Sequence, residues 1–316
     1  MINKDKKTIL VTGGAGYIGS ACTKALLDSG YDVIVVDNLS NSTKEYLDTR
    51  AKFFETNICD KQKLTEIFSA HDISAVMHFA AFKSVEESEQ DPVRYFQNNV
   101  VGTVNLLAVM QEYNVSEIIF SSSAAVYAPT ENGTCVESDK LSAINVYGNC
   151  KLIEERLITE LVRTGKLKKH SILRYFNVAG DVGLNYQDRK AKNIFPLLKE
   201  ALNNGEFTIL GADYDTRDGT CVRDYIHLSD LVDAHIKALE HKNSGIWNLG
   251  TNNGVTVKEL ITEFESVSGK KLNIKTGPRR AGDPPVLIAD AQKVKDEIGW
   301  EPKHALKEMV ESTINE

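Results

Sequence analysis

Tyr147 and Lys151 are spaced so that one side chain can tune the chemistry of the other. The residues after Tyr147 keep helical spacing, and positions four apart share a helix face, which brings the ammonium close to the phenol. A free tyrosine titrates near pH ~10 and is a poor base at neutral pH. A neighbouring ammonium stabilises the phenolate and lowers that pKa. The pair therefore predicts a tyrosine acid–base catalyst.

Ser123 is the natural partner of this pair. It ends a serine triplet at residues 121–123 that follows an apolar run at 117–120, so we expect it at the carboxyl edge of a sheet, where ligands bind in open α/β folds. Its hydroxyl can orient a substrate and share the proton. The Y-x-x-x-K pattern alone occurs by chance in many helices, so the catalytic interpretation depends on a nucleotide-binding motif elsewhere in the chain.

Such a motif lies at residues 12–20, between the first predicted strand and the first predicted helix. Gly14, Gly16 and Gly19 fit G-x-G-x-x-G, and Gly13 opens the longer G-x-x-G-x-x-G variant. Glycine allows unusual dihedrals, backbone approach to a pyrophosphate and close helix–sheet packing. The helix N-terminus then offers N–H groups to the phosphates. The strand before it, the helix after it and an acid at the end of the second strand favour this interpretation over the alternative, a glycine-rich turn without a ligand.

Asp37 ends the second predicted strand, about where an acid meets the adenosine ribose in dinucleotide-binding folds. A carboxylate there accepts hydrogen bonds from ribose hydroxyls and repels a 2′-phosphate, which favours NAD over NADP. The alternative role is a helix or turn cap.

The elements that would hold these residues alternate between strand and helix. Strand-like apolar runs occupy residues 8–12, 32–36, 75–79, 117–120 and 171–175, and helical patterns occupy 17–29, 92–113 and 147–164. This alternation predicts an α/β fold, a doubly wound parallel (Rossmann) sheet. Beyond residue 178 the elements become shorter, which indicates a smaller C-terminal α/β lobe. We expect an NAD-binding domain at 1–177 and a second lobe at 178–316, with a soft boundary that the chain can cross more than once.

Composition excludes several classes of protein. The 316 residues are 42% hydrophobic and 26% charged, which is typical of a globular protein, and the formal net charge of −7 argues against general nucleic-acid or anionic-membrane binding. The five cysteines are scattered, without a C-x-x-C pair or a Cys/His cluster, so we expect no metal site and reduced thiols. No apolar run is long enough to cross a membrane, and we expect a cytoplasmic protein.

Several segments together carry a resemblance to a known family. The glycine segment, Asp37, His78-Phe79-Ala80-Ala81, residues 121–127 and Tyr147-x-x-x-Lys151 resemble the extended short-chain dehydrogenase/reductase superfamily. Residues 174–180, 222–227 and 278–283 (RYFNVAG, VRDYIH and PRRAGD) resemble the UDP-glucose (galactose) 4-epimerase family more particularly. The similarity runs over nearly the whole chain.

The resemblance implies one NAD held as a catalytic cofactor and a UDP-hexose substrate whose carbon 4 is inverted through a transient 4-keto sugar. Tyr147 would remove the 4-hydroxyl proton, with Lys151 and Ser123 assisting. The second lobe would bind the UDP-sugar. The family resemblance also suggests a homodimer formed through the helices at 92–113 and 147–164.

Binding roles follow from the same resemblance. NAD would be bound by Gly13, Gly16, Tyr17, Ile18, Gly19, Asp37, Asn38, Asn57, Ile58, Phe79, Ala80, Ala81, Lys83, Asn98, Ser121, Tyr147, Lys151 and Tyr175. The substrate would be bound by Lys83, Ser123, Tyr147, Phe176, Asn177, Asn193, Ile194, Thr208, Ile209, Leu210, Arg223, Arg280, Asp283 and Leu287. Arg279 competes with Arg280 for its role, and each charged residue can instead form an ordinary ion pair.

The sequence departs from the family pattern at three places. Asn57 stands where Asp is common beside the adenine, and the segment 38–56 is short, which could loosen NAD retention. Leu287 falls at the position that gates the sugar, where members restricted to glucose and galactose resemble one another in having Tyr. A smaller side chain there leaves room for an N-acetyl group, so we expect UDP-GlcNAc and UDP-GalNAc to be accepted too.

Other activities share the scaffold. A nucleotide-sugar 4,6-dehydratase needs an acid pair beside the catalytic hydroxyl, and the run from Ser123 to Tyr127 holds no carboxylate. A uronate epimerase, a net oxidoreductase that releases NADH, and a non-catalytic NAD-binding regulator stay as alternatives. The regulator is disfavoured because such proteins usually lose the Tyr or the Lys, and both are present here.

Overall fold

The computed structural model describes residues 7–186, 193–280 and 283–314. These residues form two compact units. The first unit takes its residues from Met1–Val126, Leu141–Arg174 and His235–Ile246. The second takes its residues from Tyr127–Lys140, Tyr175–Ala234 and Trp247–Glu316. The chain thus passes between the units several times, and the expected division of ligand binding at residue 177/178 stays a prediction.

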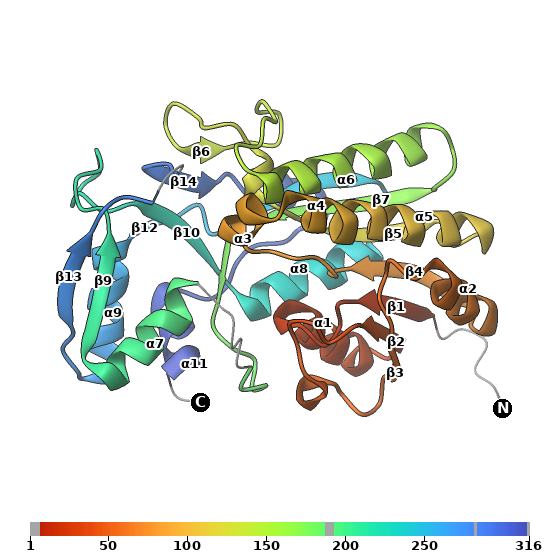
Figure 1. Ribbon diagram of the computed structural model, residues 1–316, viewed down its shortest axis with the longest axis horizontal. Coiled ribbons are helices and arrows are strands. Elements are labelled where there is room, and N and C mark those ends of the chain that lie inside the picture. Colours follow the sequence, from red (N-terminus) through yellow and green to blue (C-terminus); the bar gives the residue numbers. More distant parts are fainter. Residues whose placement is uncertain (1–6, 187–192, 281–282, 315–316) are drawn as a thin grey trace. The chain divides into compact units, whose positions relative to one another are not determined.

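A seven-stranded sheet organises the first unit, in the order β11-β7-β5-β4-β1-β2-β3 (Figure 1). Its strands are β1 (Thr8–Thr12), β2 (Asp32–Asp37), β3 (Lys52–Glu55), β4 (Ile73–His78), β5 (Glu117–Ser123), β7 (Lys169–Tyr175) and β11 (Gly245–Leu249). The last residues of β7 and β11 belong to the second unit. The pairs β1–β2, β1–β4, β2–β3 and β4–β5 are parallel. The predicted doubly wound sheet is confirmed. Its strand order reverses between β1 and β4, and ligands bind at such reversals because the following loops diverge there.

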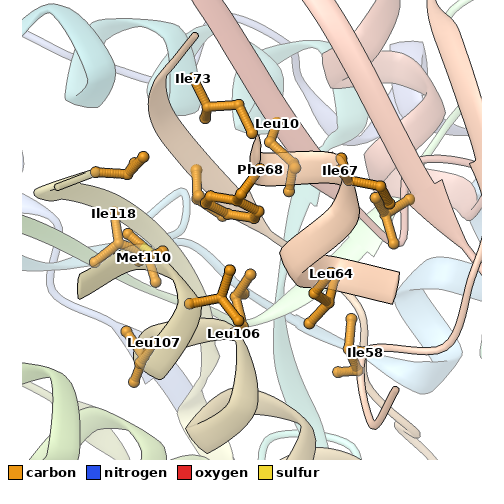
Figure 2. Packing of buried hydrophobic residues seen from close by; sticks show 14 of the residues in the cluster. Leu10, Ile58, Leu64, Ile67, Phe68, Ile73, Leu106, Leu107, Met110 and Ile118 are labelled. Atoms are coloured by element: carbon orange, nitrogen blue, oxygen red, sulfur yellow. The ribbon is translucent and has the colours of Figure 1, made fainter. Parts of the chain in front are cut away.

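Helices cover both faces of this sheet because side chains along a strand alternate between faces. Leu10 of β1 packs with Phe68 of α2 (Lys61–Ala70) and Leu106 of α5 (Gly102–Glu112), in the apolar cluster of Figure 2. On the other face of the sheet, side chains of β2 lie near α1 (Tyr17–Asp28). A Cβ built on Gly14 would lie 2.7 Å from Cγ1 of Val35 in β2 and 3.3 Å from Oγ1 of Thr23 in α1. Both faces are therefore buried, as a parallel sheet requires.

The helix predicted over residues 92–113 is broken into three parts. The structure has α4 (Pro92–Tyr95), a π-helical segment η2 (Phe96–Val101) and then α5. Asn99 lies in the π segment, and its amide accepts from Phe82 N at 2.9 Å and donates to Phe82 O at 3.0 Å. These bonds tie the wide turn to the segment after β4, a tertiary contact that helical periodicity does not reveal.

Shorter elements complete the first unit. They are η1 (Lys44–Tyr46), α3 (Val85–Gln90), η3 (Ala124–Val126) and α6 (Val146–Arg163). The segment between β2 and β3, which the sequence marks as short, holds only the single turn η1. Within the described residues, no helix is both long and apolar enough to span a membrane.

The second unit contains two smaller sheets. One has the order β12-β10-β14-β6 with β8 paired to β10, and the other pairs β13 with β9. Their strands are β6 (Thr134–Cys135), β8 (Asn177–Ala179), β9 (Glu206–Leu210), β10 (Val222–His227), β12 (Gly254–Thr256), β13 (Asn273–Gly277) and β14 (Val286–Ala289). The helices are α7 (Ile194–Asn204), α9 (Val257–Ser268), α10 (Gln292–Ile298) and α11 (Leu306–Ile314), and α8 (Leu228–Glu240) begins in this unit and ends in the first. The rings of Phe195, Tyr225 and Phe264 meet in its core, with centroids 5.3 Å apart in each contact to Phe195.

Candidate functional site

The glycine loop after β1 leaves no room for side chains at two positions. Gly13 has φ +71 and donates its N–H to Val36 O at 2.8 Å, and a Cβ there would clash with the backbone of Ala80 after β4. A Cβ on Gly19 would overlap the carbonyl oxygen of Gly13. The two glycines therefore let α1 and the ends of β1 and β4 close on one another. The loop therefore presents only backbone atoms to a ligand, as close approach of a pyrophosphate requires, and we call it the glycine cradle.

The N-terminus of α1 faces this loop without a side-chain cap. Its N-cap residue is Gly16, which has no side chain to cap the helix. The N–H groups of the first turn can serve an anion. The cradle and the uncapped helix end fit the diphosphate of NAD.

Asp37 stabilises the glycine loop and the turn after β2 through hydrogen bonds. Its Oδ2 accepts from Ala15 N at 3.0 Å, and its Oδ1 accepts from Leu39 N at 2.8 Å and from Ser42 Oγ at 2.9 Å. The turn role that the sequence left open is thus present in the structure. Ribose recognition by the same carboxylate stays a prediction, and a carboxylate has enough lone pairs for both roles.

Tyr147 lies in the first turn of α6. Asn145 caps the helix by accepting from Gly148 N at 2.8 Å, and Ser88 Oγ accepts from Tyr147 N at 3.2 Å. A Cβ on Gly148 would overlap the carbonyl oxygen of Ala125, so the helix approaches the end of β5 closely. That approach puts the phenol of Tyr147 within hydrogen-bond reach of Ser123. The structure thus brings the predicted catalytic residues together.

The electrostatics of Tyr147 differ from the sequence expectation. Burial raises the pKa of the phenol above its ordinary value, and the Lys151 charge and the Ser123 hydrogen bond only partly offset that effect. Glu154 and Cys150 raise the pKa further. The chain's own residues therefore leave Tyr147 protonated at neutral pH, because losing water disfavours the charged phenolate.

Lys151 is almost completely buried. Its Nζ lies 3.3 Å from Oε2 of Glu154 and 4.5 Å from the centroid of the Phe120 ring. Sequence reasoning missed Glu154, although an acid three residues after the lysine was a visible signal. The next residue, Glu155, is buried too and forms a two-pronged ion pair with Arg174, with N–O distances of 2.9 and 2.6 Å.

Some of the other predicted NAD-binding residues lie next to the cradle in the chain or in space. Tyr17 and Ile18 begin α1, and Ala80 and Ala81 follow β4. The Phe79 ring lies 4.9 Å from the His235 ring. Ser121 is buried in β5, and Lys83 is exposed.

The predicted adenine-side residues already make local contacts. Asn38 Oδ1 accepts from Ser40 N at 3.1 Å, and Asn57 Oδ1 accepts from Cys59 N at 2.9 Å. The Ile58 side chain is buried in the apolar cluster of Figure 2, so only its backbone is offered to a ligand. Asn98, which the family resemblance places by the nicotinamide half of NAD instead, donates to Asn99 Oδ1 at 2.9 Å.

Among the predicted substrate-binding residues of the second unit, Arg223 has the most informative contacts. Its Nη2 lies 3.5 Å from Oδ1 of Asp283, and its Nη1 donates to Val222 O at 2.8 Å. Nη2 is buried and has no hydrogen-bond partner. A buried donor without a partner is costly, so this guanidinium suits an anionic ligand. Leu287 of β14 is the register partner of Arg223.

Arg279 and Arg280, which compete for one predicted role, differ in their contacts. Arg279 donates from Nε to Asp213 Oδ1 at 2.7 Å and stacks on Tyr214, with its guanidinium 4.3 Å from the ring centroid. Arg280 is exposed, and its carbonyl accepts from Asp283 N at 3.3 Å. These contacts occupy Arg279 and favour Arg280 for ligand binding.

The remaining predicted substrate residues differ in exposure. Thr208 and Leu210 of β9 are exposed, whereas Ile209 between them is buried. Tyr175 and Phe176 precede β8, and Asn177 donates to Asp224 O at 3.0 Å. Asn193 and Ile194 begin α7, and Asn193 makes no side-chain cap bond. Their contacts with a ligand stay predictions. In the described part of the chain, no three His, Cys, Asp or Glu residues gather in a way that could hold a metal ion.

Comparison with known proteins agrees with these features. Residues 9–250 match the NAD dependent epimerase/dehydratase family. UDP-glucose 4-epimerase of Lactobacillus helveticus is 41% identical over 305 residues, covering 94% of this chain and 92% of that protein. The structure of UDP-glucose 4-epimerase from Bifidobacterium longum in complex with NAD+ and UDP is 36% identical, with TM-score 0.92 over 98% of this chain and 97% of that chain. The UDP-Glc/GlcNAc 4-epimerase of Campylobacter jejuni is 38% identical, with TM-score 0.86 over 98% of each chain. The resemblance that the sequence motifs indicate is confirmed.

Proposed function

Because the chain belongs to the NAD dependent epimerase/dehydratase family, we propose that it is a 4-epimerase that interconverts UDP-glucose and UDP-galactose with NAD as its cofactor. The observation that carries the proposal is the meeting of Tyr147, Lys151 and Ser123 in the same unit as the glycine cradle. An acid–base group beside a dinucleotide site suits an alcohol that is oxidised and then reduced again.

Tyr147 and Ser123 handle the proton of the 4-hydroxyl group. Bound NAD supplies hydride acceptance at carbon 4 and its return. Tyr147 accepts the hydroxyl proton as the 4-keto sugar forms and gives it back when the opposite face is reduced. Ser123 hydrogen-bonds to the phenol and orients the sugar oxygen. Because burial keeps Tyr147 protonated in the chain alone, its activation requires a second positive charge besides Lys151, and the oxidised nicotinamide carries one.

Arg223, Asp283 and Arg280 bind the UDP group. The Nη2 of Arg223, which has no hydrogen-bond partner among the described residues, donates to a diphosphate oxygen, and the Asp283 carboxylate accepts from ribose hydroxyls. Asp283 is only 3.5 Å from Arg223, so it also holds the guanidinium in place when no anion is bound.

Leu287 allows a larger sugar. Leu287 is partly buried and stands where family members restricted to glucose and galactose have tyrosine. The smaller side chain leaves space for an N-acetyl group on carbon 2 of the sugar. The similarity to a UDP-Glc/GlcNAc 4-epimerase supports this extension. UDP-GlcNAc and UDP-GalNAc are therefore further substrates.

The protein acts as a homodimer. Val93, Phe96, Val101 and Val104 expose 75, 37, 46 and 44% of their surface along α4, η2 and α5, and Ile153 of α6 exposes 37%. A row of exposed apolar side chains on adjoining helices is typical of an interface. Val104→Asp should turn the dimer into a monomer in light scattering. Ile274→Asp, at an apolar residue of β13 that exposes 38% of its surface, should not. A Val104→Asp protein that stays dimeric would contradict this interface.

The decisive test is a conversion assay without added NAD. The purified protein is incubated separately with UDP-galactose and UDP-GalNAc, and the products are separated by anion-exchange chromatography. Conversion of both supports the proposal in full, and conversion of UDP-galactose alone would overturn the role of Leu287. Activity that appears only after NAD is added would indicate loose cofactor retention, which the short segment before β3 explains.

Two rival functions give different results in the same assay. A net oxidoreductase would accumulate NADH with turnover, detectable by its absorbance, whereas an epimerase would not. A non-catalytic NAD-binding regulator would carry NAD and leave every UDP-sugar unchanged. A cytoplasmic location is part of the proposal and rests on the scattered free cysteines.

A further inference from the structure

Glu154 is a completely buried acid that the epimerase chemistry described above does not use. Its Oε2 lies 3.3 Å from Nζ of Lys151, and its Oε1 accepts from Thr103 Oγ1 at 2.8 Å. Oε2 has no hydrogen-bond partner, so the ammonium is its main compensation. A buried carboxylate is retained only where neighbouring groups stabilise it.

The Thr103 contact belongs to a longer chain of buried polar groups. Thr103 Oγ1 lies 2.8 Å from Nε2 of His78, and Nδ1 of His78 lies 2.6 Å from Thr12 Oγ1. Thr12 Oγ1 in turn accepts from Ala80 N at 3.4 Å, beside the glycine cradle. The side chains of Thr12, His78, Thr103 and Glu154 are at most 1% exposed.

The charge of Glu154 fixes the direction of every bond in this chain. An ionised carboxylate only accepts, so Thr103 donates to it and must accept from Nε2–H of His78. Nδ1 of His78 is then the acceptor for the Thr12 hydroxyl. Burial and the Lys151 charge lower the pKa of His78 to about 3, so the neutral ring that this arrangement needs is the form present at neutral pH. All donors therefore point from the cradle toward the carboxylate.

We propose that Glu154 is a positioning residue for the Tyr147–Lys151 pair, a buried counter-charge that the Thr12–His78–Thr103 chain holds against the Lys151 ammonium. This inference rests on the proposed function, since it gives Glu154 a role only through that pair. The carboxylate holds the Lys151 ammonium in place and weakens its attraction for the Tyr147 phenolate. The protein thereby keeps Tyr147 protonated until the cofactor's positive charge is in place.

Titratable groups face Tyr147 from several elements. Tyr95 of α4 belongs to the apolar cluster against which Tyr147 packs, and Glu89 of α3 accepts from Val146 N at 2.8 Å. Lys151, Glu154 and Cys150 act on it from α6, and Ser123 reaches it from β5. Burial raises the pKa of Cys150 to about 12, so the thiol is neutral in the working range. From β4, neutral His78 faces Lys151. A change in Tyr147 titration on removing the Glu154 charge is therefore attributable to Glu154.

The test is the titration of Tyr147 itself. Protein carrying isotope-labelled tyrosine is followed by NMR as the pH rises, with the Tyr147 signal identified by its loss in Tyr147→Phe and the bound NAD content measured. Glu154→Gln should move the titration down by at least about one pH unit, because a charge a few ångströms away shifts a pKa by that much. The acid limb of kcat/KM should move with it, while KM for UDP-galactose changes less than threefold.

Two variants separate the charge from general damage to α6. Glu160→Gln removes an exposed acid from the same helix and should leave the titration unchanged. Glu154→Leu removes the charge with an apolar side chain, and it should reproduce the downward shift if Glu154→Gln does not fold. An unchanged or upward titration in both Glu154 variants would overturn the proposal. Wild-type protein that converts no UDP-sugar would instead refute the proposed function, whatever the titration shows.

Discussion

Gly13 and Ala80 approach each other so closely that a Cβ on Gly13 would lie 2.6 Å from the Ala80 amide nitrogen. The two residues follow β1 and β4, the strands at which the order of the sheet reverses. The contact closes the floor of the cradle, and Phe79 N donates to Thr12 O at 3.0 Å just beneath it. Backbone alone therefore forms the surface on which a diphosphate would rest.

Replacing Gly13 with alanine should destroy this surface. We expect Gly13→Ala to weaken NAD binding at least tenfold, which corresponds to ~1.4 kcal/mol, because the loop must move to admit the methyl group. Gly165→Ala is the matched control: its φ of +72 equals that of Gly13 within a degree, but nothing lies within 4 Å of its Cβ position. The control should cost only about 1 kcal/mol of unfolding free energy and leave NAD binding intact. If calorimetry gave equal NAD affinities for Gly13→Ala and wild type, the role of the glycine cradle in NAD binding would be refuted.

Tyr147→Phe tests the acid–base catalyst. Removal of the phenol oxygen should reduce kcat for UDP-galactose by about 10²- to 10⁴-fold, with NAD content and thermal unfolding unchanged. Tyr113→Phe, at a tyrosine packed against the core rather than at the site, should keep nearly full activity. Because the deprotonated phenol is the base, wild-type kcat/KM should increase with pH until Tyr147 of the NAD-bound protein has lost its proton, and burial of the phenol shifts this increase toward higher pH. If Tyr147→Phe kept more than a tenth of the wild-type kcat, another residue would have to be the catalytic base.

Leu287→Tyr tests the size of the sugar pocket. A tyrosine in the register position opposite Arg223 should fill the space for an N-acetyl group. We expect at least a tenfold loss of kcat/KM for UDP-GalNAc, about 1.4 kcal/mol of discrimination, while UDP-galactose changes less than threefold. Leu287→Val, which enlarges the pocket, should keep both substrates. Full UDP-GalNAc activity in Leu287→Tyr would remove Leu287 from the specificity argument.

His227 should make the stability of the protein depend on pH. Burial, together with the His304 ring stacked at 4.3 Å, lowers the pKa of His227 to about 4. The unfolded histidine titrates near ~6.5, so below that pH the unfolded state binds the extra proton and stability falls until about pH 4. The loss is at most ~1.4 kcal/mol per pH unit.

The matched comparison is His227→Gln, which cannot take up a proton. Its melting temperature should fall less steeply than that of wild type between pH 6 and pH 4.5. His241→Gln, at the end of α8, should keep the wild-type slope. Identical slopes in wild type and His227→Gln would show that another group carries the acid sensitivity.

The sequence by itself determined the elements whose signals are local. Alternating apolar strands and helices predicted the doubly wound sheet, and glycine spacing placed the cradle between β1 and α1. The spacing of Tyr147 and Lys151 placed both on one face of α6. Each of these depends on a short-range rule, a period of two or 3.6 residues or a turn that only glycine allows.

Tertiary structure decided the features that depend on residues far apart in the chain. The π turn at residues 96–101 is tied to Phe82, the packing of α6 depends on the Ala125 carbonyl, and the Tyr147 pKa is raised by burial that no local pattern encodes. The same is true of Glu154, whose significance comes from Thr103, 51 positions away. Burial and long-range hydrogen bonds set the energies of these groups, and both exist only once the chain has folded.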